Sequence, residues 1–126
     1  MTREDYCSFE VAKLLKEKGF DEKTLSYYED NVLCHGDWFE WNRSPLGHIA
    51  APTHQMAMKW LREVHGVFIA INNDDLDFNW QCYDLINRGS TLDPKILSES
   101  YAGYKTYEEA VEAALKYSLE NLIKKK

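Results

Sequence analysis

The sequence predicts an α+β fold in which a small antiparallel sheet packs with three helices. Three segments repeat their apolar residues at helical spacing. The central one begins at Thr53, a potential N-cap, and closes at Gly66, which can adopt the left-handed conformation of a helix C-terminus. Residues 67–71 follow at once and have the composition of a buried strand. Residues 78–86 alternate apolar and polar side chains after a connection rich in Asn and Asp, which is typical of an antiparallel pair.

A helix and a loose hairpin are predicted ahead of the central helix. The helix covers residues 9–18, because Ser8 can cap its start and Gly19 ends its apolar periodicity. Two short strands, at residues 24–28 and 32–35, flank a turn-forming Glu-Asp-Asn sequence. The inward face of this first helix is expected to hold Val11, Ala12, Leu14 and Leu15.

The remaining connections and the last helix follow from local signals. Residues 36–51 show no clear periodicity, so we expect a loop there that crosses to the central helix. Residues 88–94 are expected to form another loop, and residues 98–102 a third strand. The last helix begins after Thr106, whose capping box is completed by Glu109.

Apolar stripes predict which faces of the later helices are buried. In the central helix the stripe is Met56, Ala57, Trp60, Leu61 and Val64. In the last helix it is Tyr107, Ala110, Val111, Ala114, Ser118 and Leu122. Two favourable ion pairs four residues apart are expected on the last helix, namely Glu112 with Lys116 and Glu120 with Lys124.

Composition indicates a single globular domain over residues 1–126, since a chain of 126 residues can bury a hydrophobic core of its own. Hydrophobic residues at 44% and charged residues at 29% are ordinary for such a domain. There is no apolar run of about eighteen residues and no signal-peptide pattern. The three cysteines, an odd number at wide spacing, fit reduced thiols better than disulfides. We therefore expect a cytoplasmic protein without a membrane span.

Nucleic acid is disfavoured as a partner by the net charge of −6, because like charges repel at long range. The basic run at residues 124–126 is better explained as the solvated end of a helix. Lys59 and Arg62 could belong to a helix-turn-helix motif, but that motif needs a turn of about three or four residues, and a hairpin and a loop separate the first two helices. Nucleic-acid association is therefore the alternative function and not the preferred one.

Three strings carry a resemblance to a known group of proteins. They are SFEVAKLLKEKGFDE at residues 8–22, APTHQMAMKWLRE at residues 51–63 and YEEAVEAA at residues 107–114. These strings resemble small uncharacterised proteins from prophages and mobile elements of gut bacteria. The resemblance covers the three predicted helices and implies a phage or mobile-element origin. It transfers no catalytic or binding residue, since the group has no function to transfer.

No metal site and no cofactor are expected from the sequence. Asn73, Asp75, Asp77 and Asp84 imitate the spacing of a calcium loop, but the glycine of that loop is missing and a strand pattern follows instead of a helix. The chain also carries zinc-type ligands whose spacing matches no common zinc site, and these are Cys34, His35, His48, His54 and His65.

No catalytic residues are predicted either. Ser44 with His48, and His35 with Asp37, resemble fragments of a nucleophile and base pair, but such pairs occur by chance in most chains. The six glycines are isolated, so the sequence contains no nucleophile elbow, phosphate-binding loop or dinucleotide fingerprint. A small enzyme is the least favoured of the three function classes.

The strongest functional signal is aromatic, because Trp38, Phe39 and Trp41 stand in a segment predicted to be a loop. Two interpretations are open, a flap that covers the core and an anchor for a protein partner, since large aromatic residues are enriched at interfaces. Asp37 and Glu40 favour the anchor, because acidic groups are costly to bury without partners. The preferred function is a non-enzymatic accessory protein of a phage or mobile element that acts by binding another protein.

Overall fold

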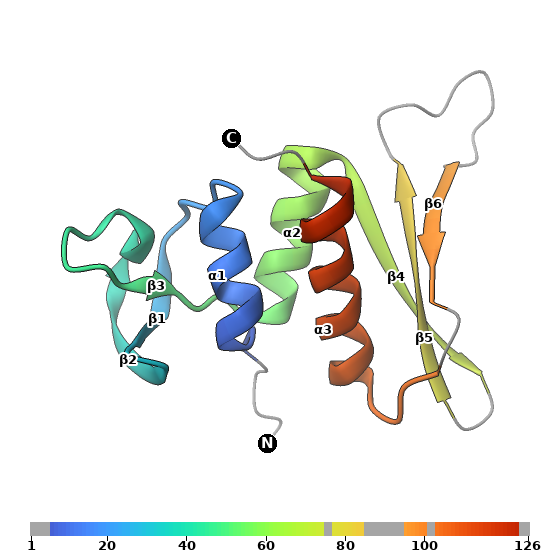
Figure 1. Ribbon diagram of the computed structural model, residues 1–126, viewed down its shortest axis with the longest axis horizontal. Coiled ribbons are helices and arrows are strands. Elements are labelled where there is room, and N and C mark those ends of the chain that lie inside the picture. The colour runs from blue at the N-terminus through green and yellow to red at the C-terminus, as the bar shows by residue number, and fades with distance from the viewer. Residues whose placement is uncertain (1–5, 75–76, 85–94, 101–102, 124–126) are drawn as a thin grey trace.

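A computed structural model describes residues 6–74, 77–84, 95–100 and 103–123. It confirms the predicted α+β class and contains three α-helices and two antiparallel sheets of three strands each. Figure 1 shows the helices in the middle of the molecule with one sheet on either side. Helices α2 and α3 cover the second sheet, whereas α1 contacts the first sheet through its short strand β3. The predicted hairpin before the central helix is therefore part of a separate sheet.

The three helices begin where their predicted caps stand. Helix α1 covers Phe9–Glu17, α2 covers His54–His65 and α3 covers Tyr107–Tyr117. The side chain of the capping residue accepts a backbone N–H three residues on in each case, with Ser8, Thr53 and Thr106 as the caps. Gly66 closes α2 in the left-handed region at φ 68°, as predicted. Helix α3 continues as a π-helical turn, Ser118–Leu122, whose backbone hydrogen bonds span five residues instead of four.

The first sheet has the strand order β2-β1-β3, with β1 at Thr24–Glu29, β2 at Val32–Phe39 and β3 at Ile49–Ala50. Asp30 and Asn31 join β1 to β2 with φ of 51° and 70°, which is the geometry of a tight hairpin turn. The predicted loop over residues 36–51 is wrong at both ends. Its first four residues extend β2, because they continue the pairing with β1 beyond a bulge, and its last residues add β3 on the other side of β1.

The second sheet has the order β4-β5-β6, with β4 at Val67–Asp74, β5 at Asp77–Asp84 and β6 at Lys95–Glu99. The β4-β5 hairpin confirms the predicted antiparallel pair, and its Trp80 and Cys82 point into the core as expected. The third strand begins three residues earlier than predicted. The expected loop at residues 88–94 and the lysines at 124–126 lie outside the described residues.

The core joins both sheets and all three helices in one cluster of buried side chains. Its largest fully buried members are Phe20, Leu15, Leu61, Leu115 and Leu119. Two predicted core positions are wrong, since Val64 is 48% exposed and Tyr107 is 41% exposed. The burial of Ala57, Trp60 and Leu61 confirms the rest of the α2 stripe except Met56, which is partly exposed. The buried faces also include His54 in α2 and Leu115 in α3, which the predicted stripes left out.

The predicted pair between Glu112 and Lys116 is also wrong. The Lys116 ammonium lies 2.7 Å from a carboxylate oxygen of Glu10 on α1. Glu112 turns toward α2 and accepts a hydrogen bond from the Ser8 backbone N–H at 3.0 Å. Contacts between helices have therefore displaced a contact within one helix.

No helix among the described residues has the length and apolar character needed to cross a membrane.

Candidate functional site

Trp41 packs against the first sheet. It opens the short 3-10 turn Trp41–Arg43, and its ring stacks on that of Tyr27 with 4.1 Å between the ring centroids. Its indole N–H donates to the Thr24 carbonyl oxygen at 3.0 Å. Gly36 makes this packing possible, because a Cβ atom there would lie 3.2 Å from both the Trp41 and the Tyr27 rings. Trp41 therefore agrees with the first interpretation of this segment, that of a flap, because its ring packs on the first sheet.

Trp38 and Phe39 instead expose much of their surface. Trp38 is 54% exposed, Phe39 is 45% exposed, and the neighbouring Leu25 on β1 is 52% exposed. These three residues are neighbours in the backbone pairing of β1 and β2, because Leu25 lies between Thr24, which pairs with Phe39, and Ser26, which pairs with His35 across the bulge. We call this group, Leu25, Trp38 and Phe39, the aromatic edge.

Two members of the aromatic edge, Trp38 and Phe39, stand on β2, the outer strand of the sheet. The order β2-β1-β3 leaves one side of β2 without a strand partner among the described residues. Proteins commonly protect such a strand with lysine, proline or an inward-pointing charge, because its free N–H and C=O groups can pair with another chain. The sequence of β2, VLCHGDWF, contains neither lysine nor proline, and Asp37 in the bulge is its only charged residue.

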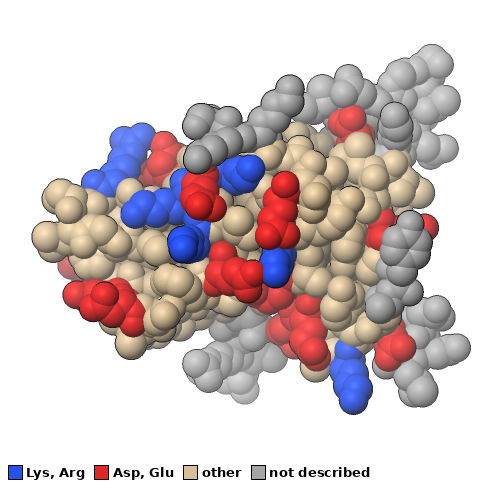
Figure 2. Space-filling model, in the orientation of Figure 1, with Lys and Arg blue, Asp and Glu red and all other residues tan. Residues whose placement is uncertain are grey.

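The basic residue Arg43, near the aromatic edge, is paired with acidic groups. Arg43 follows β2 in the 3-10 turn, and its guanidinium lies 2.8 Å from an Asp21 carboxylate oxygen and 3.3 Å from one of Glu40. Its positive charge is therefore engaged by two acidic groups. On the face of the molecule drawn in Figure 2, acidic and basic side chains are interspersed and form no broad basic surface.

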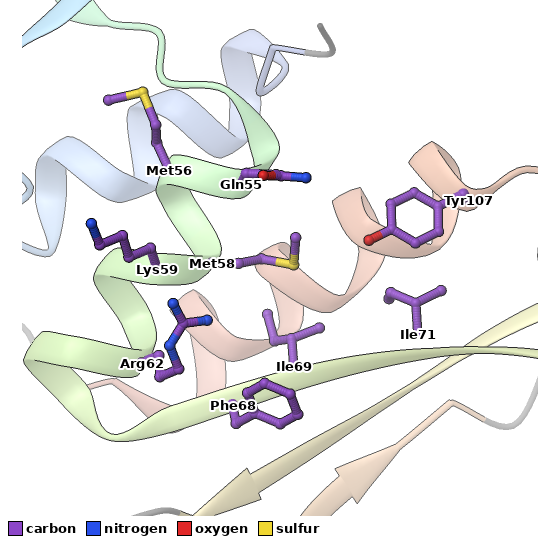
Figure 3. A pocket seen from close by; sticks show the side chains of 9 residues that line it. All are labelled: Gln55, Met56, Met58, Lys59, Arg62, Phe68, Ile69, Ile71 and Tyr107. Carbon is purple, nitrogen blue, oxygen red and sulfur yellow. The ribbon is translucent and has the colours of Figure 1, made fainter.

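A concave surface lies away from the aromatic edge, between α2, β4 and the start of α3. This α2–β4 groove has a volume of about 470 Å³, and its lining combines apolar side chains with the basic Lys59 and Arg62 (Figure 3). Ile69 is buried in the core, and Met58 and Ile71 pack against it. Much of the apolar surface of the groove therefore already serves the fold.

The structure places the remaining candidate residues in separate local contacts. The hydroxyl of Ser44 and Nδ1 of His48 lie 2.9 Å apart, so this pair does come together. The same hydroxyl also accepts the Leu46 N–H at 3.3 Å, which makes Ser44 part of a turn. The His35 ring bonds to the Ser26 hydroxyl at 2.6 Å and not to Asp37.

The residues that imitate a calcium loop do not surround a common point. Asp77 and Asp84 stand at opposite ends of β5. A strand rises about 3.3 Å per residue, so roughly 23 Å separates these positions. Asp75 lies outside the described residues.

One polar cluster is not indicated by any sequence spacing. Cys7, His54 and Glu112 bring a sulfur, an imidazole nitrogen and a carboxylate oxygen within 4.8 Å of one another. They come from the segment before α1, from the first residue of α2 and from the second turn of α3. The only local signals in the sequence are the helix caps at Ser8 and Thr53, which fix the backbone beside Cys7 and His54.

The comparisons with other proteins identify no relative. The chain matches no known protein family, no curated protein and no solved structure. The candidate functions therefore rest on the geometry of these surfaces and clusters.

Proposed function

We propose that this chain is a non-enzymatic accessory protein that binds another protein through the aromatic edge. The observation that supports this proposal is the exposure of Trp38 and Phe39 beside Leu25 on an outer strand. Single exposed apolar residues are common on protein surfaces, but adjacent exposed aromatic residues are typical of interfaces. A cytoplasmic location and a phage or mobile-element origin are part of the same proposal and rest on composition and on the sequence resemblance.

The form of the strand favours a partner that adds an extended segment beside β2. The free backbone groups of β2 can pair with such a segment. Because successive side chains of a strand point to opposite faces, Trp38 and Phe39 can each pack against partner side chains on a different face of the added segment. The two kinds of contact act together, since backbone pairing contributes affinity and the aromatic side chains contribute specificity.

Nucleic-acid binding is the alternative function, and the surroundings of the aromatic edge do not favour it. Aromatic residues that stack on bases normally stand among basic residues that contact phosphates. Here Arg43 is already paired with Asp21 and Glu40, and Asp37 lies within the strand. Trp80 of β5 does not offer a stacking surface either, since it is 5% exposed and packs beside Tyr117.

The proposal is tested by comparing capture of partners from a lysate of the source organism by the parent chain and by a Trp38→Ala, Phe39→Ala variant. We expect one protein that the parent retains and the variant loses, with affinity lowered at least about 30-fold, because truncating an interface hot spot costs about 2 kcal/mol or more. Raising the salt concentration should leave this capture largely unchanged, since apolar contacts are not screened.

A matched control is Ile96→Ala, which removes an exposed apolar side chain from β6 in the other sheet, where Ile96 is 52% exposed. This variant should capture the same protein as the parent. Capture that survives in the Trp38→Ala, Phe39→Ala variant would contradict the proposal. Capture of nucleic acid that weakens steeply with salt would favour the alternative function instead.

A further inference from the structure

The cluster of Cys7, His54 and Glu112 is buried between the helices. Cys7 is fully buried, the His54 side chain is 7% exposed and the Glu112 side chain is 27% exposed. His54 Nε2 lies 2.6 Å from a carboxylate oxygen of Glu112. An imidazole, a carboxylate and a thiol therefore meet where α2, α3 and the start of α1 come together, and polar groups at such a largely buried position need partners.

Backbone contacts hold each of the three side chains in place. The Cys7 N–H donates to the Pro52 carbonyl oxygen at 2.9 Å, and the Tyr28 hydroxyl donates to the Cys7 carbonyl oxygen at 2.7 Å. The Thr53 cap fixes the start of α2 and with it His54. Glu112 is oriented by the Ser8 N–H. Outer contacts of this kind are what keep metal ligands in position.

The spacing of the donor atoms is close to that of a metal site. A zinc ion bound at about 2.0 to 2.3 Å to tetrahedral ligands requires roughly 3.3 to 3.8 Å between them. The three donor atoms lie within 4.8 Å of one another, and the shortest separation is the 2.6 Å between His54 and Glu112. Small side-chain rotations that widen the His54–Glu112 contact and draw in the thiol would reach the required spacing.

The chemistry of the donors indicates which ion would fit. Thiolate and imidazole together are the ligands that zinc and similar transition metals prefer, whereas magnesium and calcium take oxygen ligands. A divalent ion bound here would take the Cys7 sulfur as a thiolate, with the thiol proton released to the solvent, and would neutralise the thiolate and the carboxylate of Glu112 together.

The cluster also has a route to the solvent. His54 and Glu112 line a surface depression of about 450 Å³ together with Tyr6, Ser8 and Tyr104. Glu108 and Glu109 lie on the same depression and give its wall a negative charge, which attracts cations. The open side leaves room for a fourth ligand, such as a water molecule.

From this geometry we propose that Cys7, His54 and Glu112 bind a zinc-type divalent transition-metal ion that ties the three helices together. The proposal goes beyond protein binding by the aromatic edge and departs from the expectation, drawn from sequence spacing, that the chain binds no metal. The competing interpretation is a hydrogen bond between His54 and Glu112 beside an inert core thiol, which explains the contacts but gives no function to the acidic depression.

The test uses the full chain after treatment with a chelator, titrated with cobalt(II) as a spectroscopic probe and then with zinc. A single cobalt ion per chain should bind and produce a sulfur-to-cobalt charge-transfer band in the near ultraviolet, together with the intense visible bands of a tetrahedral site. Zinc should then displace the cobalt and remove both sets of bands. Zinc should also raise the melting temperature of the chain, because a ligand that binds only the native state stabilises it.

Three variants show whether the ion is held by this cluster. Cys7→Ser should remove the charge-transfer band, whereas Cys34→Ser, which changes a thiol on the first sheet, should keep it. Glu112→Gln keeps a similar shape and should lower the zinc affinity at least about 100-fold, more than is typical for an outer contact. The parent chain is measured first, so the test does not depend on a variant that folds poorly.

The proposal is overturned if the parent chain binds no cobalt and its melting temperature does not move with zinc. It is also overturned if the charge-transfer band disappears in Cys34→Ser and persists in Cys7→Ser, because the ion would then be held at the other thiol. If the chain binds both metals but its cobalt form shows no charge-transfer band, the ion is held by oxygen and nitrogen ligands only. This result would also exclude Cys7 as a ligand.

Discussion

Trp60→Ala is expected to destabilise the protein by about 3 to 5 kcal/mol, the range for a buried aromatic residue truncated to alanine. Trp60 is 3% exposed and meets the Phe20 ring edge to face, with 5.4 Å between the ring centroids. It lies where α2 faces both the core and the end of α1, so its loss leaves a cavity that several elements share. Since domains of this size have a total stability of about 5 to 15 kcal/mol, the variant should unfold at a much lower denaturant concentration.

The matched control is Val64→Ala, one helical turn further along α2. Val64 is 48% exposed, so its truncation should change the free energy of unfolding by no more than about 0.5 kcal/mol. Chemical denaturation of both variants measures the difference. Equal losses of stability in the two variants would mean that Val64 faces the core, as the apolar stripe in the sequence predicts, and would contradict its exposed position in the structure.

Trp41→Ala is expected to have the second largest effect, a loss of about 2 to 3 kcal/mol, below the value for a fully buried tryptophan because the ring is only partly covered. The substitution removes the stack on Tyr27 and the hydrogen bond to the Thr24 carbonyl oxygen. Trp38→Ala, three residues earlier, should stay within about 0.5 kcal/mol, because Trp38 is 54% exposed.

The two tryptophan variants thus separate the flap from the anchor within one short segment. Thermal or chemical unfolding gives the stabilities, and capture of the partner gives the binding. If Trp38→Ala lowers stability as much as Trp41→Ala does, Trp38 also belongs to the packed layer and the aromatic edge is not a free surface. If Trp41→Ala alone abolishes capture without affecting stability, the roles of the two residues are reversed.

Local signals in the sequence were sufficient for the helices and for most of the strands. Ser8, Thr53 and Gly66 mark helix ends through backbone hydrogen bonds and a left-handed φ, which depend only on nearby residues. The alternation around Trp80 and Cys82 predicted a half-buried strand for the same reason. Features of this kind can be predicted because a few neighbouring residues determine them.

The extension of β2 and the division into two sheets could not be predicted in that way. Gly36 and Asp37 have low strand propensity, and they lie at a bulge whose pairing with β1 and whose cover by Trp41 are long-range contacts. The alternation of apolar residues also fails there, because the strand lies at the edge and both of its faces are partly exposed. The exposed state of Trp38 and the packed state of Trp41 follow from that bulge.

The cluster around Cys7 shows the same limit for the candidate sites. The sequence offers His54 as a zinc-type ligand, but Cys7 and Glu112 lie far from it in the sequence and come close to it only when the helices pack. Glu112 even had a plausible local partner in Lys116, which instead pairs with Glu10 of α1. Spacing along the chain carries no information about ligands that come from three segments far apart in the sequence.

The most direct test of protein binding by the aromatic edge is photo-crosslinking in cells of the source organism. A photo-reactive phenylalanine derivative is placed at the position of Trp38 and, as a control, at the position of Ile96 on the other sheet. Irradiation should join the chain covalently to one protein from position 38 and not from position 96. No product from position 38, or the same product from both positions, would contradict the account.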